Sequence, residues 1–239
     1  MDDALAPDGA IEAIALLDDP RRRELYELVS SRHDAVGRDD AAAALGMSRE
    51  LAAFHLDRLV AGGLLVAEFR RRSGRQGPGA GRPAKLYRRA PREVAVSLPR
   101  RAYPQLAETF ATALAKLDPH AVTSVVSAVA HDKGKVVGAN ARREAGPRPS
   151  HGRLKAALVS QLRGAGFEPE VDATSGDVSL CNCPYEALSA SHRDLTCGMN
   201  FAWAGGVLEG LTDPKLGADL APEPGRCCVV FRESPSRAT

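Results

Sequence analysis

The sequence predicts an α+β protein in which N-terminal helices lead into a β-hairpin, the middle is helical, and the C-terminal part mixes helices with short strands. Apolar residues recur at helical spacing in most segments, and turn-rich stretches separate short apolar runs that are typical of strands. With 239 residues, 44% of them hydrophobic and 26% charged, the chain can bury the core of one large domain or of two small ones.

Two classes of protein are disfavoured at once. No apolar run reaches the roughly 18 residues that a membrane span requires. The first residues, Met1-Asp2-Asp3-Ala4, are acidic and lack the basic-then-apolar order of a secretory signal. We therefore expect a cytoplasmic protein with no membrane partner.

Three capped helices are predicted early in the chain, after an apolar stretch at 11–17. The first covers 21–31 behind a cap at Asp18-Asp19-Pro20, with Leu25 and Leu28 facing inward. Asp39 is expected to cap a short helix over 40–45, and Gly46 to make the turn that follows. Ser48 is expected to cap the third helix. The residues expected to face inward from it are Leu51, Phe54, Leu56, Leu59 and Val60.

A two-stranded hairpin is predicted next. Gly62-Gly63 ends the third helix, 64–69 forms one strand, and Lys85-Leu86-Tyr87 returns after a loop rich in glycine, proline and arginine. Helix, short helix, glycine turn, helix and hairpin is the order of a winged helix-turn-helix. The sequence therefore predicts a DNA-binding domain of this type over residues 1–100.

Charge is concentrated in the hairpin region. The whole chain has a net charge of only +2, but residues 68–101 contain eleven Lys and Arg against two Glu, an excess of nine positive charges. Such local asymmetry favours a surface that binds phosphate, with double-stranded DNA as the expected partner. The residues expected to contact DNA lie on the third helix and on the hairpin with its loop: Ser48, Arg49, Glu50, His55, Arg58, Arg70, Arg71, Arg72, Arg75, Arg82 and Lys85.

Residues 101–149 are predicted to be a helical linker that also dimerises the chain. The stretch 103–117 places Leu106, Phe110, Leu114 and Leu117 on one helix face, and 121–130 is apolar almost all round. The segment 134–150 is rich in Gly, Arg and Pro and is expected to be a loop or a boundary.

Residues 150–239 are predicted to form a small α+β sensor domain. The patterns indicate a helix over 153–164, strands over 167–171 and 178–180, a mostly helical stretch over 187–211, and a last strand over 228–231.

All five cysteines lie in this last part, at 181, 183, 197, 227 and 228. An odd number in a cytoplasmic chain argues against a disulfide framework, whereas four thiolates can bind zinc or an iron–sulfur cluster. The expected ligands are Cys181, Cys183, Cys197 and Cys227. Cys181 and Cys183 share one side if a strand runs through both, and Cys228 faces away from Cys227 if both lie on the last strand. Buried thiols without metal, which act as small apolar residues, are the alternative.

The combination of these features resembles a known family. It consists of the winged helix-turn-helix, Gly81-Arg82-Pro83-Ala84-Lys85-Leu86-Tyr87 in the hairpin, and Asn182-Cys183-Pro184-Tyr185, Cys197 and Gly225-Arg226-Cys227 in the tail. It is similar to ArsR-like transcriptional regulators of the SufR type, the repressors of iron–sulfur cluster assembly.

The resemblance implies a homodimeric DNA-binding repressor that carries a cysteine-bound [4Fe–4S] cluster and responds to iron or redox state. Cys183, Cys197 and Cys227 match the family's cysteines. A further family cysteine, four residues before Cys183, is Ser179 in this chain, and Cys181 is the expected substitute.

The sequence leaves three alternative functions. The same DNA-binding regulator could hold structural zinc, or it could bind an organic effector while the cysteines only pack. An enzyme with Cys197 or Cys183 as nucleophile, activated by His192, would need a base in reach and an orienting partner. It would also leave the basic hairpin unexplained, so we expect a protein that is not an enzyme.

Overall fold

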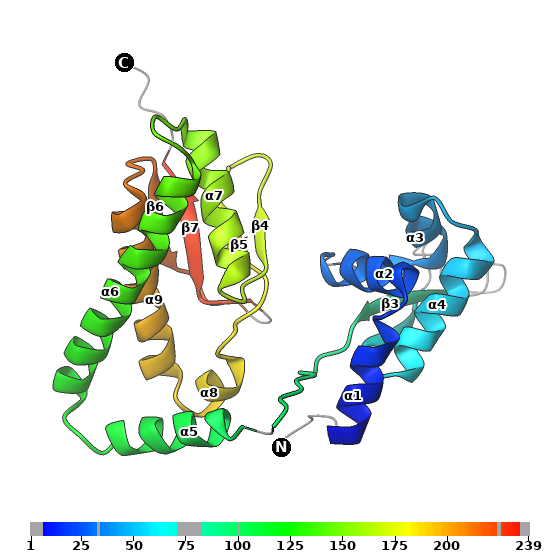
Figure 1. Cartoon of the computed structure of the whole chain (residues 1–239), viewed down its shortest axis with the longest axis horizontal. Coiled ribbons are helices and arrows are strands. Elements are labelled where there is room, and N and C mark those ends of the chain that lie inside the picture. Colours follow the sequence, from blue (N-terminus) through cyan, green and yellow to red (C-terminus); the bar gives the residue numbers. More distant parts are fainter. Residues whose placement is uncertain (1–6, 33, 71–82, 100, 224–225, 235–239) are drawn as a thin grey trace. The chain divides into compact units, whose positions relative to one another are not determined.

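A computed structural model describes residues 7–32, 34–70, 83–99, 101–223 and 226–234 (Figure 1). Of the described residues, 56% are helical and 14% lie in strands, which form two small sheets, as the α+β prediction expected. It divides into two compact units, Met1–Arg101 and Ala102–Thr239. None of the described helices is both long enough and apolar enough to cross a membrane.

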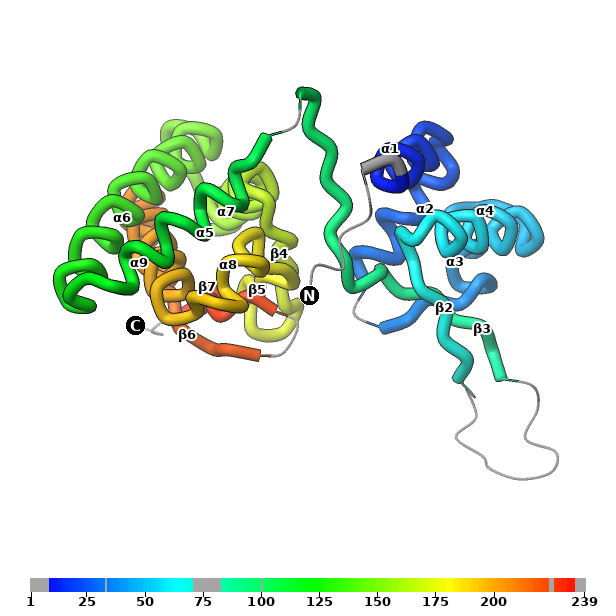
Figure 2. Tube along the Cα trace, turned by 90° about the horizontal axis from the view of Figure 1, so that it is seen from below, coloured from blue at the N-terminus to red at the C-terminus, as the bar shows by residue number. Residues whose placement is uncertain are grey.

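Among the described residues, the N-terminal unit contains four helices, which Figure 2 shows beside the β2–β3 hairpin, and a three-stranded sheet with the order β1-β3-β2. Its elements are α1 (Pro7–Leu16), α2 (Pro20–Ser30), β1 (Val36–Gly37), α3 (Arg38–Leu45), α4 (Arg49–Ala61), β2 (Leu65–Arg70) and β3 (Ala84–Arg89). Strands β2 and β3 pair antiparallel, from Leu65 opposite Arg89 to Arg70 opposite Ala84. The core of this unit includes Leu25, Leu56, Leu59, Leu65 and Tyr87, which are all almost completely buried.

Local sequence signals account for most of these helix ends. The Asp19 carboxylate accepts hydrogen bonds from the backbone N–H groups of Arg21 and Arg22 at the start of α2. Gly46 ends α3 in the left-handed conformation, with φ of 61°, which a residue without Cβ adopts readily. The cap predicted at Asp39 is wrong: α3 begins at Arg38 behind Gly37, and Asp39 lies in its first turn.

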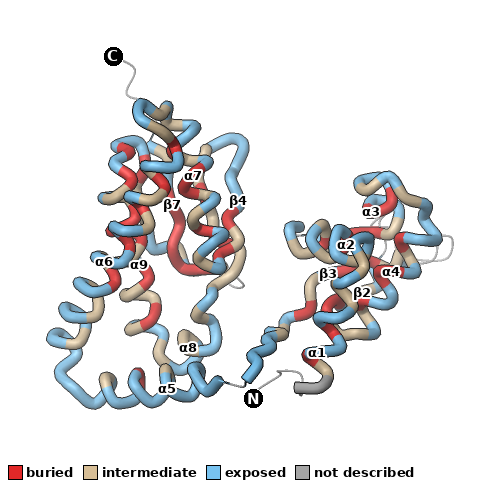
Figure 3. The backbone as a smooth tube through the Cα atoms, viewed as in Figure 1, coloured by how far each residue is buried: buried red, intermediate tan, exposed pale blue. Residues whose placement is uncertain are grey.

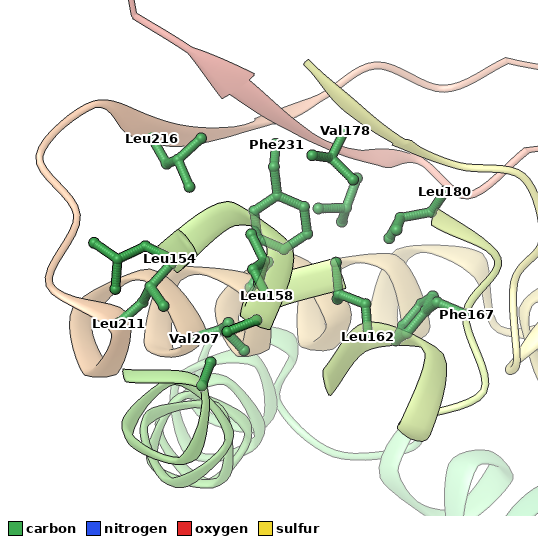
Figure 4. Close-up of a cluster of buried hydrophobic side chains, with 14 of the residues drawn as sticks. Leu154, Leu158, Leu162, Phe167, Val178, Leu180, Val207, Leu211, Leu216 and Phe231 are labelled. Carbon is green, nitrogen blue, oxygen red and sulfur yellow. The ribbon is translucent and has the colours of Figure 1, made fainter. Parts of the chain in front are cut away.

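In the described part of the C-terminal unit, helices pack against a four-stranded antiparallel sheet with the order β4-β5-β7-β6. Its elements are α5 (Tyr103–Leu114), α6 (Pro119–Glu144), α7 (His151–Gly164), β4 (Pro169–Val171), β5 (Val178–Leu180), α8 (Glu186–Ser191), α9 (Arg193–Leu211), β6 (Leu216–Leu220) and β7 (Val229–Glu233). Leu158 and Leu162 of α7 meet Val178, Leu180 and Phe231 of the sheet in the core (Figure 4).

The prediction of a loop or boundary over 134–150 is wrong for most of that segment, because α6 continues to Glu144. Its glycines lie against the backbone of α9. A Cβ at Gly134 would lie 2.1 Å from the carbonyl oxygen of Trp203, and one at Gly138 would lie 2.0 Å from that of Val207. Here glycine allows close helix packing rather than a turn.

The same close contact is made from the other helix. A Cβ at Gly206 would lie 2.0 Å from the carbonyl oxygen of His131, and one at Gly210 would lie 2.2 Å from that of Lys135. Residue numbers rise together along both helices, so α6 and α9 run parallel and pack nearly backbone to backbone.

Burial is uneven within the C-terminal unit. Most of α5 and the first half of α6 are exposed, whereas the second half of α6, α7, α9 and the sheet bury their facing sides (Figure 3). Leu106, Phe110 and Leu117 are 48%, 60% and 59% exposed, and Val125 of α6 is 64% exposed. An apolar face is thus open to solvent on these two helices.

Candidate functional site

Two groups of residues in the described chain are candidates for function, one in each unit. The first lies on the outer face of α4 and on the β2–β3 hairpin. The second is the group of cysteines around the start of α9 and the start of β7. Each is described from its own unit.

Helix α4 begins as predicted, because the Ser48 hydroxyl accepts a hydrogen bond from the backbone N–H of Leu51 at 3.2 Å. Ser48, Arg49, Glu50 and Arg58 are all exposed. The guanidinium of Arg49 pairs with Asp39 of α3 at 2.5 Å, whereas Arg58 makes no ion pair with any residue that the structure describes. The exposed face of α4 therefore offers two cations and a carboxylate.

Two neighbours on α4 have the opposite orientation from the one predicted. His55 is 6% exposed and Phe54 is 57% exposed. The residues that α4 buries are Ala52, His55, Leu56 and Leu59, which follow true helical spacing. The predicted inward set included Phe54 and Leu51, which lie outside that stripe. His55 therefore belongs to the core, and Phe54 belongs to the outer face.

The hairpin places Arg70 at an exposed strand end, while Arg71, Arg72, Arg75 and Arg82 lie outside the described residues. Lys85 donates to the Asp57 carboxylate of α4 at 2.7 Å. The hydroxyl of Tyr87 donates to the same Asp57 oxygen at 2.8 Å. Burial opposes ionisation of Asp57, but these two hydrogen bonds hold its pKa below the usual value. This network joins the hairpin to α4.

Four cysteines of the C-terminal unit line one region of its core. Cys183 lies in the turn between β5 and α8, Cys197 on α9, and Cys227 and Cys228 in the bend just before β7. Cys227 and Cys228 are buried, at 2% and 8% exposure, and none of the five cysteines forms a disulfide. The side-chain alternation expected of Cys227 and Cys228 does not apply, because β7 begins only at Val229.

The thiols of Cys183 and Cys227 affect each other's ionisation, and Cys228 affects the ionisation of Cys197. The Cys227 thiol donates to Cys183, which lowers the pKa of Cys183 to about 7 against the opposing effect of burial. The same bond, with burial, raises the pKa of Cys227. Cys197 pairs with Cys228, and burial followed by that hydrogen bond raises the pKa of Cys197 to about 11. Cys183 thus ionises more easily than Cys197 or Cys227.

Cys181, a predicted ligand, has different neighbours. Strand β5 ends at Leu180, so the alternation that would place Cys181 beside Cys183 stops there. The Cys181 thiol lies 3.6 Å from the Glu170 carboxylate, and its backbone N–H donates to the carbonyl of Glu168. Burial and the Glu170 charge raise the pKa of Cys181 to about 11.

Two buried polar side chains of α9, Thr196 and Asn200, flank Cys197, and each is 2% exposed. The Asn200 amide N–H donates to the Cys227 sulfur at 3.1 Å. The Oδ1 atom of Asn200 and the hydroxyl of Thr196 have no hydrogen-bond partner among the described residues. Sequence reasoning missed both residues. The available signal was two polar side chains four positions apart on an otherwise apolar helix face.

His192 is engaged elsewhere. Its Nε2 atom lies 3.0 Å from the Glu108 carboxylate of α5, which also accepts from the Ser191 hydroxyl. His192, the base that a cysteine-nucleophile enzyme would need, is therefore hydrogen-bonded to a carboxylate.

A single metal ion does not fit this arrangement of thiols. Among the described residues, no three Cys, His, Asp or Glu side chains converge closely enough to hold one ion. Cys183, Cys197, Cys227 and Cys228 belong to the core cluster that also contains Phe167, Tyr185 and Trp203.

Comparison of the chain with protein-family models, with curated proteins and with solved structures found no match.

Proposed function

We propose that this protein is a homodimeric DNA-binding transcriptional regulator, acting as a repressor, with an iron–sulfur cluster of the [4Fe–4S] type in its C-terminal unit. The observation that carries the DNA-binding part is the exposed, capped α4 that follows the left-handed Gly46 turn and leads into an arginine-rich hairpin. In this proposal the N-terminal unit is a winged helix-turn-helix, α4 is its recognition helix, and β2–β3 is its wing.

The surface chemistry of the N-terminal unit supports a DNA partner. Arg49 and Arg58 stand on the exposed face of α4, and Arg70 stands at the end of β2. An arginine on a recognition helix can bind a guanine edge or a phosphate, and basic wing residues follow the backbone. Phe54, on the same face, offers apolar contact to a thymine methyl group.

Arg58 provides the test of the DNA-binding proposal. Binding sites are selected from random double-stranded DNA, and affinities for the best site are measured at two salt concentrations. Arg58→Ala is expected to weaken binding about tenfold, the usual loss for one good arginine contact. Arg163→Ala, which removes an exposed arginine of α7, serves as the matched control and should leave affinity unchanged. Wild-type protein that selects no sequence would contradict the proposal.

The cysteine site supports the cluster. Soft thiolates are the ligands of iron–sulfur clusters, and Cys183, Cys197 and Cys227 are the residues proposed to hold it together with a fourth thiolate. When bound, such a cluster supplies sensitivity to iron supply and to oxidants. The chain's own contribution is burial, the Asn200 N–H on the Cys227 sulfur, and a Cys183 thiol that is easily ionised.

Iron, acid-labile sulfide and zinc are measured on protein purified without oxygen. The wild-type chain is expected to contain iron and sulfide in equal amounts and to be brown, and Cys183→Ser/Cys197→Ser/Cys227→Ser is expected to be colourless. Stoichiometric zinc without iron in the wild-type chain would replace the cluster by a zinc site. DNA affinity, measured on the same samples, reports the first part of the proposal separately.

The exposed apolar face of α5 and α6 supports the homodimer. Large apolar side chains that remain exposed together mark association surfaces more often than chance exposure does. Leu106, Phe110 and Leu117 follow each other at helical spacing from α5 into the turn after it, and Val125 and Val129 are exposed on α6. A second copy offering the same face would cover it, as two-fold dimers do.

A further inference from the structure

We infer that Phe54 is a specificity-determining residue of α4, which packs its ring against the 5-methyl group of a thymine in the major groove. The role assigned to Phe54 rests on the proposed DNA-binding function and deepens it, because it fixes one base that the binding site must contain opposite α4.

The place of Phe54 on α4 follows from the backbone of the helix and does not depend on a side-chain rotamer. The residues that α4 buries are Ala52, His55, Leu56 and Leu59. At about 100° per residue, Phe54 lies roughly 150° around the helix from the middle of this buried stripe. Phe54 is 57% exposed and stands close to the centre of the outward face, where a helix in the major groove presents its side chains to base edges.

The phenyl ring of Phe54 already rests on a core residue. Its centroid lies 5.2 Å from that of the His55 imidazole, in an edge-to-face arrangement with 69° between the ring planes. His55 is 6% exposed and belongs to the buried side of the helix. A ring with such a support loses less conformational freedom on binding than a free side chain does. The exposed part of the ring is therefore a preorganised apolar contact surface.

The surroundings of Phe54 favour DNA over an apolar protein partner. Leu51 is the other exposed large apolar residue of α4, and it is 40% exposed. Glu50 and Arg58, one turn before and one turn after Phe54, are both exposed. Two apolar side chains between charged ones differ from the centre of a protein interface, which is depleted of charge. The hairpin region that follows α4, residues 68–101, has an excess of nine positive charges, which complements the charge of DNA.

Thymine is the base that such a ring distinguishes. In the major groove its 5-methyl group is the apolar feature that the edges of adenine, guanine and cytosine lack. The phenyl ring of Phe54 forms no conventional hydrogen bonds, so it recognises that methyl group by removing it from water. Loss of the methyl group from this contact is therefore expected to lower affinity about fourfold, which corresponds to one buried methylene group.

The test uses the full-length chain and the best site selected from random double-stranded DNA. Each thymine of that site is replaced, one at a time, by deoxyuridine, which lacks only the methyl group. For the wild-type chain we expect a thymine in each half-site whose replacement weakens binding about fourfold. Phe54→Ala should bind the thymine and uracil forms of that position equally. Phe69→Ala, which removes an exposed phenylalanine of β2, is the matched control and should keep the wild-type ratio.

A second measurement uses only the wild-type chain. The thymine at the sensitive position is replaced by cytosine, with or without a 5-methyl group, and guanine is placed opposite. The methylated cytosine is expected to bind about fourfold more tightly, because it restores the group that Phe54 contacts.

Three results would overturn the role of Phe54 while leaving DNA binding intact. They are a best site in which no change from thymine to uracil lowers affinity, equal binding of the two cytosine forms, and a Phe54→Ala variant that still distinguishes thymine from uracil. A wild-type chain that selects no sequence would instead refute the proposed DNA-binding function.

Discussion

Asp57 is the residue through which α4 holds the hairpin in place. It accepts hydrogen bonds from the Tyr87 hydroxyl at 2.8 Å and from the Lys85 ammonium at 2.7 Å. Tyr87 is completely buried, and burial together with the Asp57 charge raises its pKa, so the phenol remains a donor throughout the physiological range. The orientation of the hairpin thus depends on one carboxylate of the proposed recognition helix.

Tyr87→Phe removes one of these hydrogen bonds and little else. We expect it to destabilise the hairpin by about 1 kcal/mol, because Asp57 is partly exposed and water can replace the lost donor. Hydrogen–deuterium exchange of the β2–β3 amides should be several-fold faster in the variant, while exchange in α7 is unchanged. Equal exchange in the two proteins would show that the bond is not important for the hairpin.

The same network gives a pH dependence with a definite sign. The pKa of Asp57 is lowered in the folded chain, so its contribution to stability is present above the unfolded value, about 3.9, and is lost as pH falls through the folded value. The difference between Tyr87→Phe and wild type should therefore shrink in acid below pH 4.

At the scale of elements, the packing of α6 against α9 is the main contact between helices in the described C-terminal unit. Two glycines on each helix face the backbone of the other, at Gly134 and Gly138 and at Gly206 and Gly210. Such an approach brings the two main chains close over a long stretch and leaves no room for a Cβ. The second half of α6 is thereby held along α9, which carries Cys197 and Asn200.

Gly138→Val tests this contact between α6 and α9. A Cβ there would lie 2.0 Å from a backbone carbonyl oxygen, and backbone cannot yield as the tip of a side chain can. We expect a loss of roughly 3 kcal/mol in the free energy of unfolding, at the upper end for overpacking. Urea unfolding followed by the fluorescence of Trp203, the single tryptophan, gives the measurement.

Gly152→Ala is the matched control, because a Cβ at Gly152 meets nothing within 4 Å. It is expected to leave stability unchanged or slightly higher, since alanine is the better helix former. A Gly138→Val variant as stable as this control would mean that the two helices can separate without cost.

Elements with strong local signals were predictable from the sequence, and contacts across the chain were not. The caps at Asp19 and Ser48, the turn at Gly46, and α7 with its apolar stripe all follow from neighbouring residues. The helical second half of α6 was missed because glycine is typical both of turns and of close contacts between helices. Strand β6 was missed as well, since its register depends on β7.

The candidate sites divide in the same way. That cysteines gather in the C-terminal part was visible in the sequence, but which of them meet depends on where β5 stops and β7 starts. If β5 continued for one or two more residues, Cys181 and Cys183 would lie on the same side of the strand. Because β5 ends at Leu180, the Cys181 thiol lies beside Glu170 instead. On α4 the prediction placed Phe54 inward and His55 outward, and both are wrong. The sequence of this helix is compatible with two overlapping apolar stripes.

At the scale of the whole molecule, each of the two compact units has its own buried core, and each carries one candidate site. The proposed regulator therefore separates DNA binding from the cysteine site within one chain. Dimerisation through α5 and α6 would give one molecule two copies of the proposed recognition helix, as binding to paired half-sites requires.

Phe110→Glu tests the dimer. Placing a carboxylate in the middle of the exposed apolar face should convert the protein to a monomer in light scattering, because an unpaired charge would be buried at the interface. Val171→Glu, a change of the same kind on the exposed strand β4, is the control and should remain dimeric. DNA affinity should fall only in the first variant, and a wild-type chain that is monomeric would refute the dimer.

The glycine contact between α6 and α9 also restricts which residues homologous proteins can have at these positions. Positions whose neighbours are main-chain atoms accept almost no substitution, whereas exposed residues of the same helices can drift freely. Descendants of a common ancestor should therefore keep Gly at 134, 138, 206 and 210 as a linked set, even after the rest of both helices has diverged. Together with the cysteines, these four glycines form a signature by which distant homologues of this chain can be recognised.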